Sequence, residues 1–538
     1  MKKIMPFMCL VAILSITGCK KGGRRNAAKD TPETLEIYAW NGGYGVEWVS
    51  EIVNEFKAQE WVKEKYPNLD VLSPIINDNY GYAQGRLSTG TRNTIDLMFT
   101  PGARDYFGPS GGLVDLTDVV YNQNVPGEEI KFIDKMEKSY RISNQYTDPK
   151  NASNTSYYSV SWAGGMDGII YNETILNSLG IKVPNTTNEL IQACATIMSY
   201  KNNSEGKYNK GYSFIQTYDA DYWDALFPIW WAQYEGADGF TNFYNGIDNN
   251  RYSKDIFKQQ GRKYSLEVFQ SILDYSKGYL APESFRYEFM QGQLLFLQGN
   301  GVFHANGDWF DNEMRELSKE IQNMNTFKTM RTPILSKLGE KLGISDTELS
   351  KLVDYIDGNG SIIDFESSQG YTDEEVIEEI TKARGIVHSI GPNHQAVIPS
   401  HAEGKEVAID FLRFMASDIA LESYARATKG NTLPFEFNVK EKNPSLYESF
   451  STIQKSRIDY FNNGRYALTI LPSENGFPLY NYAGLKPFIQ YDGKDNKYFQ
   501  TFSQSGNTDT PENFMQRTID FWTDEKWSRA LRDAGLSL

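Results

Sequence analysis

The chain is too long for a single hydrophobic core. It has 538 residues, whereas single cores stop growing above about 250 to 300 residues, so we expect two lobes of unequal size. Its three cysteines are Cys9, Cys19 and Cys194, and the first two lie in or beside the leader described below. Burial rather than disulfide bonding must therefore stabilise the domain. Cys194 lies at helical spacing from Leu190 and Ile197, which predicts a small buried hydrophobe rather than a reactive thiol.

The first residues have the features of a lipoprotein signal peptide, which we assign to residues 1–18. Two lysines precede the apolar run 4–16, which is shorter than the roughly 18 residues needed to span a bilayer. The run ends in Ile-Thr-Gly-Cys, which resembles a bacterial lipobox with Cys19 as the acylated residue; the alternative is an ordinary cleaved signal. Residues 19–32 have few apolar side chains to bury, so we expect them to form a flexible tether. The basic residues of this tether either favour an anionic membrane surface or only keep the tether solvated.

The charge balance excludes one class of partner. The chain has 69 acidic and 54 basic side chains, a formal net charge of −15, and removal of the leader makes it more negative. Acidic chains bind nucleic acid poorly, so no nucleic-acid partner is expected. No segment beyond the leader is apolar enough to cross a membrane.

Strands and helices alternate at the start of the domain. Residues 35–40 have the pattern of a strand and are followed by the turn residues Asn-Gly-Gly. Apolar residues from Trp48 to Phe56 then recur at helical spacing, which predicts a helix with Trp48 in the core. Further strands are expected at 71–76 and 95–99. This order is typical of a mostly parallel, three-layer α/β lobe.

The middle of the chain contains a bend and a clear helix start. Strands are expected at 155–160 and 168–172, separated by two glycines that suit a hinge. Thr186 and Glu189 have the spacing of a capping box, in which each side chain binds the other's backbone amide. A helix should therefore begin at this point.

The last third adds helices and returns to strands. Residues 318–385 are charged, with two helical patterns, and we interpret them as an elaboration of the second lobe. Strand pieces are expected at 386–390 and 396–399, followed by a helix with Phe411 and Met415 on its apolar face.

These landmarks resemble the extracellular solute-binding proteins of family 1, the maltodextrin-binding type that supplies sugars to ABC transporters. Thr187 stands where the family usually has Trp, and Ser161-Trp162 replaces its usual proline. The resemblance covers most of the chain after the tether and rests on residues 35–56, 95–99 with 112–117, 157–162 with 170–173 and 180–190, 301–309, and 396–417.

The resemblance implies a type II periplasmic-binding-protein fold, with two α/β lobes, a hinge and the ligand between the lobes. Hinge closure around a ligand is the general behaviour of such proteins. Mapped onto this chain, the first lobe takes residues 33–162 and 387–429. The second lobe takes residues 163–386 and 430–538, with the elaboration at 318–385.

Candidate binding residues are those that suit a sugar. A sugar ring presents an apolar face for aromatic side chains and hydroxyls for carboxylates and amides. Each candidate has a structural alternative, since tryptophans are often core residues and Asn or Asp can cap helices. Of the adjacent tryptophans at 230 and 231, at most one is expected to face the core. The candidates are Trp40, Asn41, Tyr44, Trp162, Trp223, Trp231, Asn306, Asp308 and Trp309.

The sequence favours binding over catalysis. The four histidines are dispersed, and no metalloprotease or serine-hydrolase motif is present. No cofactor is expected, although a structural Ca²⁺ stays open. The resemblance implies a monomeric lipoprotein of an ABC importer, which binds a carbohydrate, most simply an oligosaccharide, and delivers it to a membrane permease. It would be lipid-anchored outside the cell membrane, or periplasmic if there is an outer membrane.

Three alternatives stay open. In the first, the protein binds a peptide or another small solute instead of a carbohydrate. In the second, it is a lipid-anchored glycoside hydrolase, whose pair of catalytic carboxylates the sequence cannot locate. In the third, it is a surface interaction protein with no small ligand.

Overall fold

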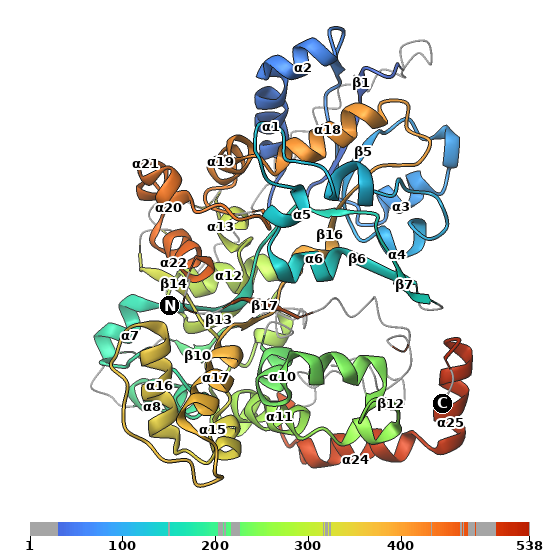
Figure 1. The fold of residues 1–538 in the computed structure, drawn as a ribbon. Coiled ribbons are helices and arrows are strands. Elements are labelled where there is room, and N and C mark those ends of the chain that lie inside the picture. Colours follow the sequence, from blue (N-terminus) through green and yellow to red (C-terminus); the bar gives the residue numbers. More distant parts are fainter. Residues whose placement is uncertain are drawn as a thin grey trace, which may run out of the picture.

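The computed structural model describes residues 31–148, 151–202, 208, 211–216, 226–315, 317, 321, 324–431, 433–462, 465, 467–471, 479 and 502–536. These residues form two lobes, one above the other in Figure 1, each with its own sheet and flanking helices. The α/β class predicted from the sequence is therefore confirmed.

The upper lobe is built on a five-stranded sheet with strand order β4-β2-β5-β16-β8. Strand β2 pairs in parallel with β4 and β5, whereas β16 runs antiparallel to β5 and β8. This sheet therefore combines segments that lie far apart in the sequence. Its strands are β2 (Ile37–Trp40), β4 (Ile75–Asn77), β5 (Leu97–Pro101), β8 (Val160–Ser161) and β16 (His394–Val397), with the pairs β1 (Thr34–Leu35) and β3 (Asp70–Val71), and β6 (Gln145–Asp148) and β7 (Asn151–Tyr157), beside it.

Both faces of this sheet are covered. Ile37 and Ala39 point into the cluster that includes Trp48 and Phe56 of α1, whereas Tyr38 points into a smaller cluster on the other face. This alternation is the two-residue period of a strand, and it confirms the expected core position of Trp48. The helices of this lobe are α1 (Glu47–Ala58), α2 (Glu60–Lys65), α3 (Tyr82–Leu87), α4 (Arg104–Phe107), α5 (Phe132–Lys135), α6 (Lys138–Asn144), α18 (Lys405–Met415) and α19 (Asp418–Ala427).

The lower lobe contains a four-stranded sheet with strand order β10-β13-β9-β14. Strand β13 is parallel to β10 and antiparallel to β9, and β14 is antiparallel to β9. The strands are β9 (Asp167–Asn172), β10 (Tyr212–Phe214), β13 (Gly301–Gly307) and β14 (Phe327–Met330), with the separate pairs β11 (Ile247–Asp248) and β12 (Arg251–Tyr252), and β15 (Ile386–Val387) and β17 (Thr469–Ile470).

Helices surround this second sheet. The capping box is present as predicted, because the amide of Glu189 donates to the Thr186 hydroxyl at the start of α8 while the Glu189 carboxylate accepts from the Thr186 amide. Cys194 on the same helix is buried, as predicted. The helices are α7 (Glu173–Leu179), α8 (Thr187–Asn202), α10 (Phe227–Asn245), α11 (Gln260–Leu273), α12 (Phe289–Leu297), α13 (Phe310–Glu313), α15 (Ser336–Leu342), α16 (Asp346–Asp357), α17 (Asp373–Arg384), α20 (Val439–Lys442), α21 (Pro444–Glu448), α22 (Thr452–Phe461), α24 (Pro511–Phe521) and α25 (Asp524–Asp533).

The chain passes between the two sheets three times. Residues 162–166 join β8 to β9, and residues 388–393 join β15 to β16. The third passage runs from α19 to α22, which packs on β14. The three passages hold the two lobes next to each other, and each lobe keeps a sheet of its own.

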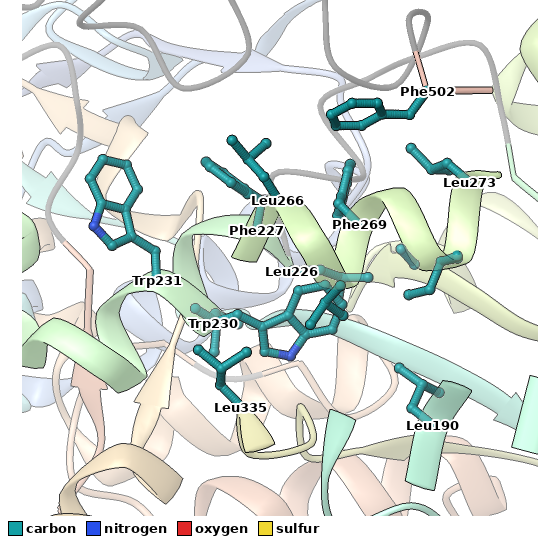
Figure 2. Close-up of a cluster of buried hydrophobic side chains, with 14 of the residues drawn as sticks. Leu190, Leu226, Phe227, Trp230, Trp231, Leu266, Phe269, Leu273, Leu335 and Phe502 are labelled. Atoms are coloured by element: carbon teal, nitrogen blue, oxygen red, sulfur yellow. The ribbon is translucent and has the colours of Figure 1, made fainter. Parts of the chain in front are cut away.

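The largest core corrects one prediction. Trp230 and Trp231 are both fully buried, whereas at most one was expected to face the core. Figure 2 shows their rings leaving α10 in different directions, each among apolar side chains. The reason is that α10 is packed by α11, α15 and α17 and lies inside the lobe rather than on its surface. Their indole nitrogens donate to the Pro333 carbonyl and to Gln259.

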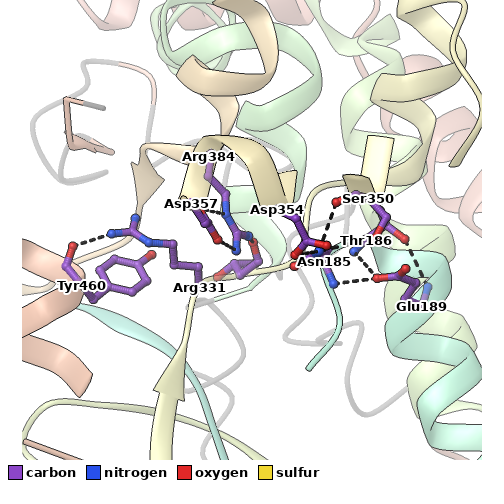
Figure 3. A network of polar contacts seen from close by, with 10 residues as sticks. Asn185, Thr186, Glu189, Arg331, Ser350, Asp354, Asp357, Arg384 and Tyr460 are labelled. Atoms are coloured by element: carbon purple, nitrogen blue, oxygen red, sulfur yellow. Dashed lines mark hydrogen bonds and ion pairs between the residues drawn. The ribbon is translucent and has the colours of Figure 1, made fainter. Parts of the chain in front are cut away.

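A buried polar network anchors the added helices α15, α16 and α17, which share a small core of their own. The guanidinium of Arg384 donates to both oxygens of Asp357, at 3.1 and 2.6 Å. Arg331 lies over the ring of Tyr460, 3.7 Å from its centre, beside this pair (Figure 3). Asn185 donates to Asp354 and joins the start of α8 to α16.

The Arg384–Asp357 pair gives a test of this anchoring. Asp357→Asn should lower the free energy of unfolding by about 3 to 5 kcal/mol, because it leaves a buried guanidinium without its counter-charge. The double variant Asp357→Asn, Arg384→Met should recover much of the loss, since neither member of the pair is then left as a buried charge without its partner. Urea unfolding followed by fluorescence measures both. The control Lys382→Ala removes an exposed ion pair from the same helix and should change nothing measurable; an equal loss there would contradict the prediction.

Candidate functional site

The two lobes touch where the loop after β2 meets the turn after β13. The Tyr44 hydroxyl of the upper lobe donates to Oδ1 of Asp308 in the lower lobe, at 2.7 Å. Beside it, Nδ2 of Asn312 donates to the Gly43 carbonyl, at 2.8 Å. We call these two hydrogen bonds the interlobe latch, because they join the lobes directly rather than through the three chain passages.

Aromatic rings from both lobes pack around the latch. The ring of Tyr44 stands edge-on to Trp162, Trp309 and His394, with centroid distances of 6.0, 6.4 and 5.1 Å. Trp162 also stacks on Trp48, at 5.5 Å and an interplanar angle of 22°. Trp309 comes from the lower lobe but joins the apolar cluster of the upper one. We call Tyr44, Trp162, Trp309 and His394 the ring cluster.

Glycines permit this close approach. A side chain at Gly43 would place its Cβ 2.5 Å from Cβ of Trp309, and one at Gly165 would collide with the Asp308 carboxylate. The glycines that the sequence suggested for a turn and a hinge therefore also make room for the opposite lobe.

Burial perturbs both partners of the latch, and the Asp308 carboxyl is the one whose shift reaches the neutral pH range. Only 3 % of Asp308 is exposed. Burial raises the pKa of this carboxyl to about 6 and nearby Asp167 adds to the rise, whereas Arg457 and the Tyr44 hydroxyl oppose it. Arg457 also donates to the Asp308 carbonyl, at 2.9 Å. Burial raises the pKa of the Tyr44 hydroxyl as well, so Tyr44 donates as a neutral phenol.

Other polar groups near the latch are held in defined states. Burial lowers the pKa of His394 to about 4, so this ring is neutral, and its Nδ1 donates to the Ile390 carbonyl at 3.0 Å. Among the buried atoms without a hydrogen-bond partner in the described part of the chain are Nε1 of Trp162 and Oδ1 of Asp167, on either side of the hinge. A donor and an acceptor at the hinge are groups that ligand hydroxyls can satisfy.

The rim of this region is aromatic and accessible. Trp40 at the end of β2 is half-buried, and its ring stands edge-on to Tyr80, at 6.0 Å. Asn41 next to it is exposed, as is 60 % of Tyr80. Tyr80 was missed in the sequence, although residues 77–79, Asn-Asp-Asn, mark a turn after a parallel strand, where ligands of such sheets bind. The structure thus brings together Trp40, Tyr44, Trp162, Asp308 and Trp309.

The remaining predicted residues lie elsewhere. Asn306 is buried, and its Nδ2 donates to Nε2 of His304, at 2.9 Å, while its Oδ1 accepts from Gly307. Trp231 makes its contacts within the core of the lower lobe. Trp223 and Cys19 lie outside the described residues.

In the described part of the chain, no group of three or more His, Cys, Asp or Glu side chains is arranged to hold a metal ion. No helix in that part has the length and apolarity needed to cross a bilayer.

This architecture defines a class. Two α/β lobes joined by three passages, with the upper sheet in the order described, form the type II periplasmic-binding fold that the resemblance implied. Residues 42–271 match the model of the family described as bacterial extracellular solute-binding protein, so the predicted resemblance is confirmed. That family is one of binding proteins rather than catalysts. No curated protein matches the chain in sequence.

Solved structures agree on the fold. A chitin oligosaccharide binding protein is 13 % identical, with a TM-score of 0.53, and the match covers 93 % of this chain and 99 % of that one. RafE from Streptococcus pneumoniae is 13 % identical, with a TM-score of 0.55 and coverages of 92 % and 98 %. An ABC substrate-binding protein from Listeria monocytogenes in complex with cycloalternan is 12 % identical, with a TM-score of 0.53 and coverages of 94 % and 99 %.

The perturbed carboxyl gives a pH test. The pKa of Asp308 is about 6 when buried and 3.8 ordinarily, so the folded protein holds this proton more tightly than the unfolded chain. The stability that this bound proton gives the folded state is fully present below the pKa of Asp308 in the unfolded chain. It is lost as the pH rises through the pKa of Asp308 in the folded protein, and the free energy of unfolding falls by roughly 3 kcal/mol in between. Asp308→Asn should therefore be more stable than the native chain at about pH 7 and nearly equal at about pH 3.5, measured as thermal unfolding midpoints.

The exposed variant Asp70→Asn is the control and should follow the native chain at every pH. A constant difference between Asp308→Asn and the native chain across this range would show that the buried carboxyl does not titrate.

Proposed function

We propose that this protein is the substrate-binding component of an ABC importer and holds a carbohydrate between its lobes. The observation that carries the proposal is the contact of the two lobes through the latch and the ring cluster. It joins aromatic surfaces from both lobes to a buried carboxylate, beside a donor and an acceptor that have no partner in the part of the chain that the structure describes. Aromatic faces with such polar groups suit polyhydroxylated rings.

The proposed binding step starts with opening of the latch. Separation of the lobes breaks the Tyr44–Asp308 bond and frees Trp309 from the upper lobe. Sugar rings then stack on Trp40, Trp162 and Trp309, while Asp308 and Asn41 bind hydroxyls. We add Tyr80 to this set because it is exposed beside Trp40. Asn306 is kept as a hydroxyl ligand only if its bond to His304 breaks as the lobes separate.

Similar structures support the class of ligand. The printed names of two of them refer to chitin oligosaccharide and to cycloalternan, both carbohydrates. The chain is only 12 to 13 % identical to them in sequence. A likeness at this level shows a common fold but does not tell which sugar is bound. An oligosaccharide is favoured over a single ring because Trp40 and Tyr80 extend the aromatic surface outward from the ring cluster.

The leader supports the proposed location. We propose that Cys19 is acylated after residues 1–18 are removed and that residues 19–32 tether a monomeric domain to the outside of the cell membrane. From there the loaded protein delivers its sugar to the permease subunits, without chemistry on the ligand.

Calorimetry against a panel of oligosaccharides tests the ligand. We expect heat with at least one glycan, and Trp40→Ala should weaken that binding by about 1 to 3 kcal/mol, the range for an aromatic anchor. The control Trp61→Ala changes a half-buried tryptophan on α2, outside the latch and the ring cluster, and should leave the affinity unchanged. Absence of heat with every glycan, with heat from a peptide mixture instead, would replace the carbohydrate by a peptide.

A further inference from the structure

Tyr424 lies near the end of α19, where the third passage between the lobes begins. Its carbonyl accepts a hydrogen bond of 2.7 Å from the hydroxyl of Thr428, which caps that helix. Its ring stands edge-on to Trp48, with a centroid distance of 5.3 Å, and Trp48 stacks on Trp162 of the ring cluster. Tyr424 is therefore only one ring away from the ring cluster, on the side of the upper lobe.

The hydroxyl of Tyr424 lies near the contact between the lobes, and the residue is fully buried. Burial is the main cause that raises the pKa of this hydroxyl, and the negative charge of Asp308 is the second. The pKa of Tyr44, which is raised first by burial and by Asp308, is also raised by Tyr424. Since Asp308 belongs to the lower lobe, the Tyr424 hydroxyl lies at the boundary that opens when the lobes separate.

This hydroxyl has no hydrogen-bond partner in the part of the chain that the structure describes. Two other phenols near Asp308 differ in this respect. Tyr44 donates to Asp308, at 2.7 Å, and the hydroxyl of Tyr140 lies 3.2 Å from that of Ser389. A buried hydroxyl without a partner destabilises a fold. Phenylalanine would pack equally well on Trp48, so packing does not account for the oxygen.

The two atoms at the hinge that have no partner, Nε1 of Trp162 and Oδ1 of Asp167, belong to the same region. Trp162 is linked to Tyr424 through Trp48. After burial, Asp167 is the other cause that raises the pKa of Asp308, so the two carboxylates lie near each other.

These three groups come from α19, the first passage and β9, so no single local distortion explains all of them. They comprise a donor, an acceptor and a hydroxyl that can act as either. Such a set is what the hydroxyls of a sugar can satisfy.

We propose that Tyr424 is a ligand-binding residue of the interlobe site, whose hydroxyl bonds a hydroxyl of the carbohydrate once the lobes have separated. This inference rests on the proposed function and adds to it a contact from a helix behind the latch. Separation of the lobes moves Asp308 and Trp309 away from the upper lobe and uncovers the phenol. A hydroxyl of the ligand then supplies the partner that is missing while the latch is formed.

Tyr424→Phe tests this role, because it removes the oxygen and keeps the ring. The probes are maltotetraose, raffinose, xylotetraose and chitotetraose, measured by calorimetry on the full-length chain. The variant should bind the glycan that the native chain binds best roughly three- to tenfold more weakly, which is the effect of losing one hydrogen bond. Without ligand, its thermal unfolding midpoint should equal or exceed that of the native chain, because a buried group without a partner has been removed.

Tyr121→Phe is the matched control. Tyr121 is also a fully buried tyrosine of the upper lobe, but its hydroxyl donates to the Ser159 carbonyl, at 2.7 Å. Loss of this bond should lower the thermal unfolding midpoint and leave the affinity for the glycan unchanged. The same chemical change should therefore reduce binding at Tyr424 and stability at Tyr121.

Equal affinity of Tyr424→Phe and the native chain for a glycan that both bind would overturn the inference and leave the proposed function standing. A midpoint of Tyr424→Phe as low as that of Tyr121→Phe would also overturn it, because the Tyr424 hydroxyl would then have a structural partner. If the native chain binds none of the four glycans, the result counts against the proposed function itself, and the inference falls with it.

Discussion

The hydrogen bond between Tyr44 and Asp308 is the contact on which the arrangement of the lobes depends. Removing a carboxylate from water is costly unless strong donors replace the water. Here the Tyr44 hydroxyl and the charge of Arg457 do so, and the pKa of Asp308 is still raised to about 6. The bond can form only because Gly43 and Gly165 let the opposite lobe approach. Separation of the lobes would therefore have to break the hydrogen bond of one buried carboxyl.

Each lobe has a large apolar cluster, and a few side chains cross from one lobe into the cluster of the other. One large apolar cluster includes Trp48 and the upper sheet, and another includes Trp230 and the lower sheet. Trp309 belongs to a lower-lobe turn but packs in the upper cluster, as do Val387 of β15, Tyr460 of α22 and Ile470 of β17. Trp231, in contrast, packs wholly within the lower cluster, so the proposal includes Trp309 as a ligand contact and leaves Trp231 out.

Local patterns predicted the elements well and the site only in part. The helix around Trp48, the capping box at Thr186 and the buried Cys194 follow from spacing and from short-range hydrogen bonds. The burial of both Trp230 and Trp231 could not be predicted, because it depends on helices α15 and α17, more than a hundred residues away. Tyr80 was missed for a similar reason, since its place beside Trp40 depends on the pairing of β2 with β4.

The strand order of the upper sheet has a consequence for biosynthesis. Strand β16 lies between β5 and β8, yet about 290 residues separate its Gln395 from Ala103, to whose amide Gln395 binds. The upper sheet therefore stays incomplete until most of the polypeptide has been made. Long-range pairings of this kind fold slowly. The first lobe can close its sheet only after strand β16, which ends at residue 397 of 538, has left the ribosome.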